Sequence, residues 1–411
     1  MGATNLKCRE CSTEYNLEAK YVCERCFGPL EVSYEHDVSD VDSMRRRIQG
    51  GPQNLWRYHD FLPLEGPQPR TRTGLPAGCT PLIRADRLAE RLGLREVWVK
   101  NDAANPTHSF KDRVVSVAVH RAKELGFEVL ACASTGNLAN SVAAHGAALG
   151  MESYVFIPSN LEEQKVLATG VYGTNLVKVR GNYDDVNRLC TELSGERDWA
   201  FVNVNMRPYY AEGSKTLAYE IVEQLGWEVP DRVVAPIASG SLYTKIGKGF
   251  QEWLDLGLVS GEAPVMNGAQ ALGCSPVATA YAAGTDVCRP VKPDTIAKSL
   301  AIGNPADGPY AIELARRSGG GIDSVTDDEI REGIRLLAET TGIFTETAGG
   351  TTTAVLKKLA DRGDIDPDER VAVIITGEGL KTLDAVRGTF TEHEIAPSYD
   401  EFVEQVEGVR A

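Results

Sequence analysis

The sequence predicts an α/β protein with two lobes, each a parallel sheet covered by helices, and a small cysteine-rich module at the N-terminus. From residue 97 onward, short β-branched runs alternate with longer amphipathic segments, which is the pattern of parallel sheets covered by helices. The chain has 411 residues, whereas a single core usually stops growing near about 250. Four of the nine cysteines lie within the first 26 residues, which sets that segment apart.

The composition argues against nucleic-acid and membrane partners. Asp and Glu number 58 against 43 Lys and Arg, so the net charge is -15 and the surface repels phosphate backbones and anionic lipids. No apolar run approaches the ~18 residues that a membrane span needs, and the N-terminus has no signal-peptide core. We therefore expect a cytoplasmic protein whose partner is a small molecule.

Residues 1–34 form a predicted zinc-ribbon-like module. Cys8, Cys11, Cys23 and Cys26 make two C-x-x-C pairs, and four thiolates at this spacing suit a tetrahedral zinc ion. A segment this short has no core of its own and would gain folding energy from the metal. Thiols without a metal, or a redox pair, are the alternatives. The module carries few basic residues, so a structural or interdomain role is favoured over nucleic-acid binding.

Eight runs are expected to be strands, and each is followed by a helix-like segment. These runs are residues 97–100, 128–134, 153–158, 175–181, 200–205, 231–239, 265–271 and 371–379. We assign residues 35–100 and 220–411 to a large lobe and residues 101–219 to a smaller, mobile lobe. Ligands of such sheets bind beyond the carboxyl ends of the strands, so the residues after each run are candidates for function.

The stretch "NPTHSFKDRVV", residues 105–115, places a lysine at the start of a predicted helix. Ser109 would cap this helix and leave Lys111 in its first turn. A charged amine there opposes the helix dipole, whereas an amine held neutral as an imine escapes that cost. An ordinary surface lysine is the alternative interpretation of this stretch alone.

The stretch "CASTGNLANS", residues 132–141, joins a predicted strand to an Ala-rich helix. Ser134, Thr135, Gly136 and Asn137 form the turn, where glycine permits a close backbone approach. The free N–H groups at the start of such a helix can bind an anion such as a carboxylate. A simple helix cap is the alternative.

Two further strand ends carry small polar residues. In "APIASGSLYTK", residues 235–245, the turn contains Ser239, Gly240 and Ser241, whose amides and hydroxyls could hold a phosphate. No nucleotide P-loop motif occurs in the chain. In "VAVIITGEGLKT" the strand ends at Thr376, whose hydroxyl could bond a heterocycle nitrogen, and a plain strand-end turn is the alternative.

The motifs "NPTHSFKDR", "STGNLANS", "ASGSL", "EGSKTLAYE" and "TGEGLKT", in this order, resemble those of the threonine synthases. These are pyridoxal-phosphate enzymes of fold type II, and the resemblance covers nearly the whole chain, including the cysteine module that some members carry. It is especially close in "FVNVNMRPYYAEGSKTLAYEI" and "KSLAIGNPADGPY". The resemblance implies a fold type II enzyme with the cofactor bound by the large lobe, and it implies a homodimer.

The resemblance also implies roles for individual residues. Lys111 would hold pyridoxal 5'-phosphate through an imine and later move protons. Asn137 would bond the phenolic oxygen of the cofactor, and Thr376 would face its pyridine nitrogen. A hydroxyl at that nitrogen does not enforce a pyridinium, so the electron sink is weaker. The cofactor phosphate would lie on Ala238, Ser239, Gly240, Ser241 and Leu242.

The implied substrate is O-phospho-L-homoserine, which the family converts with water into L-threonine and phosphate. Ser134, Thr135 and Asn137 suit the substrate carboxylate. The candidates for its phosphate are polar or cationic residues that follow the predicted strands or open the helices, namely Arg113, Asn205, Arg207, Ser214 and Lys215.

Two departures from the family pattern bear on the substrate. The segment "ASGSL" has fewer glycines than the usual cofactor-phosphate loop, and Tyr210 stands where many members have an arginine. Arg207 is the candidate to compensate. The alternatives are a β-replacing or β-eliminating relative, such as cysteate synthase or a threonine/serine dehydratase, or a degenerate enzyme that serves as a binding protein. The presence of Lys111, Asn137 and Thr376 argues against degeneracy.

Overall fold

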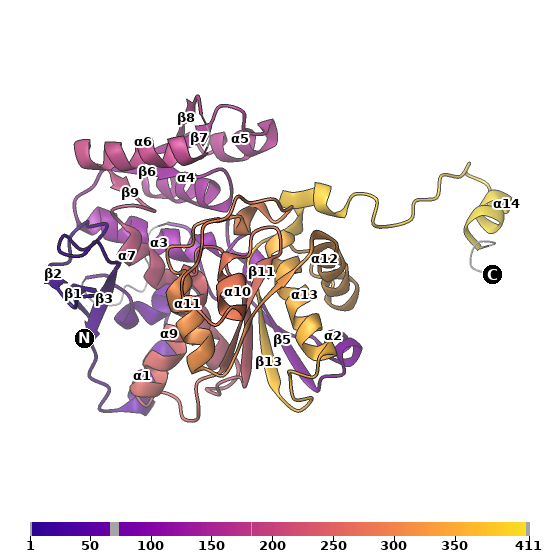
Figure 1. Cartoon of the computed structure of the whole chain (residues 1–411), viewed down its shortest axis with the longest axis horizontal. Helices are drawn as coiled ribbons and strands as arrows, with labels where there is room; N and C mark the ends of the chain where they lie inside the picture. The colour runs from indigo at the N-terminus through magenta and orange to yellow at the C-terminus, as the bar shows by residue number, and fades with distance from the viewer. Residues whose placement is uncertain (1, 66–73, 182, 408–411) are drawn as a thin grey trace.

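A computed structural model describes residues 2–65, 74–181 and 183–407 of the chain. It contains a six-stranded sheet, a four-stranded sheet and a small three-stranded sheet. Figure 1 shows the four-stranded sheet with its helices above the larger lobe, and the N-terminal sheet at one side. The α/β architecture with parallel sheets agrees with the sequence prediction.

The six-stranded sheet forms the centre of the large lobe, in the order β12-β11-β10-β13-β5-β4. Its strands are parallel except β4, which pairs antiparallel with β5 at one edge. Residues 371–375 of β13 are fully buried, as expected for a central strand covered by helices on both faces. The strands are β4 (Leu82–Arg84), β5 (Glu96–Asn101), β10 (Arg232–Pro236), β11 (Val265–Ala271), β12 (Ile322–Val325) and β13 (Arg370–Ile375).

Helices from both ends of the chain cover this sheet. They are α1 (Val41–Gln49), α2 (Asp86–Leu92), α8 (Thr216–Gln224), α9 (Ser241–Asp255), α10 (Pro276–Ala282), α11 (Gly308–Arg317), α12 (Asp327–Thr341) and α13 (Thr347–Asp361). The edge strands β4 and β12 were not predicted from the sequence. They are short, and β12 reads "IDSV" with two polar residues, so neither has the apolar run that marks a central strand.

The four-stranded sheet is parallel throughout, in the order β8-β7-β6-β9. Its strands are β6 (Val129–Ala133), β7 (Glu152–Pro158), β8 (Asn175–Val179) and β9 (Ala200–Phe201). Five helices lie on this part of the chain, namely α3 (Lys111–Glu124), α4 (Asn137–Leu149), α5 (Glu163–Gly170), α6 (Tyr183–Glu196) and α7 (Arg207–Glu212). Strand β9 is shorter than predicted because the side chain of Asn205 folds back onto the amide of Phe201, at 2.8 Å, and closes a turn.

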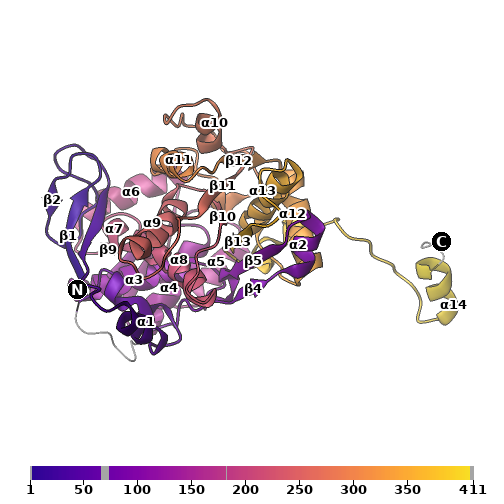
Figure 2. The same cartoon turned by 90° about the horizontal axis from the view of Figure 1, so that it is seen from below.

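The N-terminal module is an antiparallel sheet of β1 (Gly2–Cys8), β2 (Glu14–Tyr15) and β3 (Leu30–Glu35), in the order β2-β1-β3. Its buried Leu6, Cys23 and Val32 belong to the same apolar cluster as residues of α3, α4 and α7. The module therefore shares its core with the lobe that it covers. Figure 2 shows it beside α7 and α9.

The C-terminal segment extends away from both lobes and carries the short helix α14 (Tyr399–Phe402) (Figure 1). Within the described residues, none of the helices is long and apolar enough to cross a membrane.

Candidate active site

Helix α3 begins at Lys111, where the chain passes from the large sheet to the smaller lobe. The prediction that Ser109 caps this helix is wrong, because Phe110 occupies the N-cap position and no side chain caps the helix. The backbone of Ser109 instead pairs with Gly377, and the amide of Phe110 donates to the carbonyl of Thr376 at 2.9 Å. The end of β13 therefore lies directly beside the lysine.

The carboxylate of Asp112 shapes the loop that leads into α3. It accepts from the amide and the hydroxyl of Thr107, at 2.6 and 2.8 Å, and from the hydroxyl of Ser141 on α4, at 2.6 Å. Burial would raise the pKa of Asp112, but His145 and these hydrogen bonds outweigh it and lower the pKa. An ionised Asp112 thus fixes the loop to α4 and orients the residue before it, Lys111.

The amine of Lys111 is partly exposed and meets a tyrosine from another helix. Its Nζ donates to Tyr210 Oη at 2.8 Å and lies 4.6 Å from the centre of the Phe110 ring. Tyr210 is the residue that departs from the family pattern. The structure places it in direct contact with the amine.

Asn137 and Thr376 converge on one buried carboxylate, that of Glu346. Asn137 Nδ2 donates to Glu346 Oε2 at 3.0 Å, and Thr376 Oγ1 donates to Glu346 Oε1 at 3.3 Å. On the other side, Lys381 Nζ donates to Asn137 Oδ1 at 2.9 Å and to the carbonyl of Thr107 at 2.6 Å. The structure therefore brings the two predicted ring-binding residues into one network.

Glu346 and Lys381 were missed in the sequence analysis. Burial raises the pKa of Glu346, although the Asn137 hydrogen bond and the Lys381 ammonium act in the opposite direction. Burial lowers the pKa of Lys381, and the Glu346 carboxylate opposes this. Both shifts mark a low-dielectric site, which is typical of functional centres. Lys381 lies within the motif "TGEGLKT" and could have been found there, whereas "FTETAGG" gave no such signal for Glu346.

The turn between β10 and α9 has the features that a phosphate requires. Gly240 has φ 101°, and a Cβ there would lie 2.6 Å from the carbonyl oxygen of Asp307, so only glycine fits. Helix α9 starts at Ser241 without a side-chain cap, which leaves its first N–H groups open to an anion. The hydroxyls of Ser239 and Ser241 add donors. The segment from Ala238 to Leu242 therefore fits the cofactor phosphate, despite its few glycines.

Helix α7 links this turn to the lysine. Arg207 Nη2 donates to Asp307 Oδ2 at 2.8 Å, and the amide of Asp307 donates to the carbonyl of Ser239 at 2.8 Å. Tyr210 is three residues after Arg207 and so lies on the same side of the helix. Helix α7 thus contacts Lys111 through Tyr210 and is connected with the predicted phosphate turn through Arg207 and Asp307.

The turn before α4 offers a second anion site on the smaller lobe. Helix α4 begins at Asn137 with exposed Gly136 as its N-cap and no side-chain cap. Ser134 is buried, whereas Thr135 is partly exposed. Since Asn137 belongs to the network around Glu346, this turn is next to that network.

Arg113 is not at this site, although it is two residues from Lys111. Its side chain is fully buried and pairs with the carboxylates of Asp102 and Glu220, at 2.6 to 2.8 Å. The remaining donors reach the hydroxyls of Thr216 and Thr80, at 3.0 and 2.9 Å. No donor is left for a substrate phosphate, so we do not carry Arg113 into the proposed site.

Three other candidates for the substrate phosphate are likewise buried or engaged in contacts within the protein. Lys215 is fully buried and pairs with Glu212 and Glu252, at 2.7 and 2.9 Å. Asn205 is engaged in the turn after β9, and Ser214 is buried beside Lys215. Among the predicted cations, Arg207 keeps 23% of its side chain exposed.

The four module cysteines are close enough to hold one metal ion. Their sulfur atoms all lie within 4.8 Å of one another, and Cys8 and Cys26 are 3.4 Å apart. Tetrahedral zinc with bonds of about 2.3 Å requires sulfurs about 3.8 Å apart, so the donor set fits zinc.

Comparisons with known proteins agree with this geometry. Residues 74–377 match the family described as pyridoxal-phosphate dependent enzymes. The chain is 40% identical to a threonine synthase of Methanocaldococcus jannaschii, over 92% of this chain and 93% of that protein. It is 38% identical to a threonine synthase of Methanosarcina acetivorans, over 92% of each.

Solved structures show the same fold at lower identity. A maize serine racemase matches with a TM-score of 0.61 and 18% identity, over 73% of this chain and 89% of that one. A threonine deaminase from Solanum lycopersicum matches with a TM-score of 0.63 and 19% identity, over 86% and 94%. The chain therefore belongs to the pyridoxal-phosphate dependent enzymes of fold type II and, within them, to the threonine synthase family.

Proposed function

We propose that this protein uses pyridoxal phosphate to convert O-phospho-L-homoserine and water into L-threonine and phosphate, the last step of threonine biosynthesis. The observation that carries the proposal is the 40% identity with a threonine synthase over 92% of the chain. The site supports it, because the partly exposed Lys111 contacts α7, and hydrogen bonds through Asp307 connect α7 with a turn suited to the cofactor phosphate.

For the cofactor, we assign the covalent bond to Lys111, the phenolic oxygen to Asn137 and the ring nitrogen to Thr376. The phosphate would lie on residues 238–242, where the open N–H groups of α9 and two hydroxyls are available. When bound, pyridoxal phosphate draws electrons from the bonds at the α-carbon of an amino acid, which makes that proton removable. Glu346 would hold the side chains of Asn137 and Thr376 in place.

For the substrate, we assign the carboxylate to Ser134, Thr135 and the N–H groups that open α4. The phosphate would lie near Arg207 and Tyr210, which share one side of α7. The amine of Lys111 would take the α-proton, and its partial exposure and its contact with Tyr210 of α7 support this role. Tyr210 would orient this amine through the 2.8 Å hydrogen bond.

For the module, we propose a structural zinc ion on Cys8, Cys11, Cys23 and Cys26. The short distances between the four sulfurs support it. Metal analysis of the purified protein should give one zinc per chain, and a chelator should lower the melting temperature. A protein that is free of zinc and equally stable would argue for empty thiols. We also propose a cytoplasmic homodimer, as the family resemblance suggests, and sedimentation would test the dimer.

The direct test of the reaction mixes the cofactor-loaded protein with O-phospho-L-homoserine and follows threonine and inorganic phosphate together. Equal release of both products is expected. Release of a 2-oxo acid and ammonia from threonine or serine, without turnover of the phosphorylated substrate, would instead indicate a dehydratase. No turnover with a normally bound cofactor would leave the fold assignment intact and overturn the proposed substrate.

A further inference from the structure

Consecutive tyrosines on α7 have different partners, one in the module and one at the lysine. Tyr209 Oη donates to the carbonyl of Glu18 in the module, at 2.8 Å. Tyr210 Oη accepts from Lys111 Nζ, at 2.8 Å. Because both residues are on one short helix, any displacement of that helix changes both contacts together.

The end of α7 is attached to the module a second time, through Glu212. This carboxylate is fully buried and accepts from Tyr34 Oη on β3, at 2.8 Å. It also accepts from Lys245 Nζ at 2.7 Å, and the same ammonium reaches Glu31 on β3 at 3.0 Å. Burial would raise the pKa of Glu212, but Lys215 and Lys245 outweigh it and hold the pKa well below its usual range. The contacts between α7 and the module therefore include a buried carboxylate as well as the neutral hydrogen bond of Tyr209.

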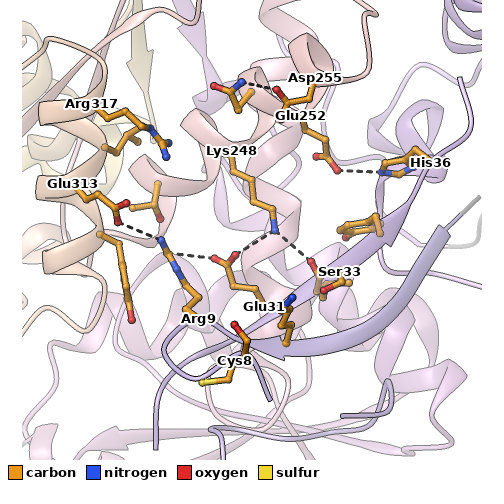
Figure 3. A pocket seen from close by; sticks show the side chains of 18 of the residues that line it. Cys8, Arg9, Glu31, Ser33, His36, Lys248, Glu252, Asp255, Glu313 and Arg317 are labelled. Atoms are coloured by element: carbon orange, nitrogen blue, oxygen red, sulfur yellow. Dashed lines mark hydrogen bonds and ion pairs between the residues drawn. The ribbon is translucent and has the colours of Figure 1, made fainter. Parts of the chain in front are cut away.

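The module also borders a cavity beside the large lobe, shown in Figure 3. This cavity, of about 620 Å³, lies between the module and the helices α9 and α11. The ion pairs between the module and these helices vary in length: 3.0 Å from Lys245 to Glu31, 3.4 Å from Lys248 to Glu31, and 3.9 Å from Arg9 to the exposed Glu313. The module is thus attached to α9 and α11 as well as to α7, and its contacts with α7 are the ones that reach the helix of Tyr210.

The module also contacts α3 and α7 through a shared apolar core. Buried residues of β1 and β3, such as Leu6 and Val32, form one apolar cluster with Val115 of α3 and Tyr209 of α7. Helix α3 carries Lys111 at its first position. The module therefore packs against both helices that meet at the lysine.

We propose that the cysteine module positions the active site: it holds α7 through Tyr34 and Glu18, so that the hydroxyl of Tyr210 meets Lys111. Tyr34 and Tyr209 are positioning residues, because they act through α7 and do not touch the lysine. The inference rests on the proposed function in assigning turnover to Lys111. It gives the module a role in turnover that a purely structural metal site would not have.

The test removes the two module hydroxyl contacts with the double substitution Tyr34→Phe and Tyr209→Phe. Both rings remain, so the core should stay packed. We expect kcat to fall by about tenfold, in line with the cost of a slightly misplaced catalytic group, with a smaller change in KM. The control is Tyr310→Phe, which removes the hydrogen bond between α11 and Glu10 of the module but leaves α7 untouched. It should leave kcat unchanged.

A double-mutant cycle with Tyr210→Phe decides whether the effect passes through Tyr210. If it does, the Tyr34→Phe and Tyr209→Phe substitutions should not lower kcat further in a protein that already carries Tyr210→Phe. Losses that add independently would overturn the proposal, and so would an unchanged kcat in the Tyr34→Phe, Tyr209→Phe protein.

The visible absorbance of the cofactor-loaded protein gives a readout that does not need turnover. Tyr210→Phe should shift this band, because it removes the partner of the lysine that holds the cofactor. The Tyr34→Phe, Tyr209→Phe protein should shift it in the same direction, and Tyr310→Phe should not. If no threonine forms, the proposed reaction fails but the spectra still test the positioning. An unshifted band in the double variant would overturn it.

Discussion

Lys111 and Arg113 are two residues apart on α3, yet the structure puts them in opposite environments. The amine of Lys111 is partly exposed between the lobes and meets the hydroxyl of Tyr210. The guanidinium of Arg113 is fully buried, and the carboxylates of Asp102 and Glu220 flank it. The first environment leaves a group free to react, and the second uses every donor to hold helices together.

The difference shows that a motif can combine two kinds of function within one helical turn. Residues two apart differ by about 200° in direction around a helix, so "KDR" leaves the lysine partly exposed and turns the arginine to the interior. A positive charge near a catalytic lysine is therefore no sufficient evidence for a phosphate site. Burial and the number of satisfied donors decide between the two.

Replacing the lysine should have the largest effect. Lys111→Ala should reduce threonine formation by about 10⁴-fold, the upper end for loss of a proton-transfer group, and should abolish the visible absorbance of the bound cofactor. The melting temperature of the cofactor-free protein should barely change, because the amine has few contacts. A variant that keeps its absorbance would show that another lysine holds the cofactor.

Replacing Arg113 should have the opposite effects, namely a large loss of stability and little change in KM. Arg113→Met leaves Asp102 and Glu220 buried without their main counter-charge, which typically costs about 3–5 kcal/mol of unfolding free energy. Denaturant unfolding measures the loss. In whatever folded fraction remains, KM for O-phospho-L-homoserine should be close to normal. A large rise in KM with unchanged stability would return Arg113 to the substrate site.

The buried ion pairs predict a loss of stability in acid. Burial would raise the pKa of Glu220, but Arg113 and Lys100 outweigh it and lower the pKa to about 2, from an ordinary value of 4.5. Since the folded-state value is the lower one, the stabilisation is complete above pH 4.5 and is lost as the pH falls toward 2. Unfolding free energy measured across this range should decline, and the decline should be shallower in Arg113→Met.

The smallest effect should come from Glu346, whose pKa shifts the other way. Burial raises this pKa, so the ionised form costs stability once the pH exceeds the ordinary value of 4.5. Glu346→Gln should therefore modestly raise the melting temperature of the cofactor-free protein at pH 8, and the gain should shrink toward pH 4. A destabilised variant at pH 8 would mean that Asn137 and Thr376 require the charge.

Much of the fold could be predicted from the sequence, because its central strands are continuous apolar runs that end in small polar residues. The run at 231–239 contains β10, and the run at 371–379 covers β13 except its first residue; Gly240 and Thr376 come after these two strands. The two C-x-x-C pairs likewise predicted the gathering of four sulfurs. These features are local, so the order of residues along the chain is enough to reveal them.

The remaining features depend on contacts between distant segments. Glu346 meets Asn137, 209 residues away, and Tyr210 meets Lys111, 99 residues away. Similarly, Arg113 pairs with Asp102 and Glu220, and Lys215 pairs with Glu252, all from other segments, although its second partner Glu212 is only three residues away. The sequence identified the chemical types that the site needs, whereas the structure decided which members of each type reach it.

The assignment of Lys111 is tested most directly by locating the lysine that carries the cofactor. Borohydride reduction of the loaded protein fixes the bond, and mass spectrometry of its peptides then identifies the modified residue. We predict the modification on Lys111, in the peptide that contains "SFK". Lys381 is a second amine of the site, hydrogen-bonded to Asn137 at 2.9 Å, and modification there would contradict the central assignment.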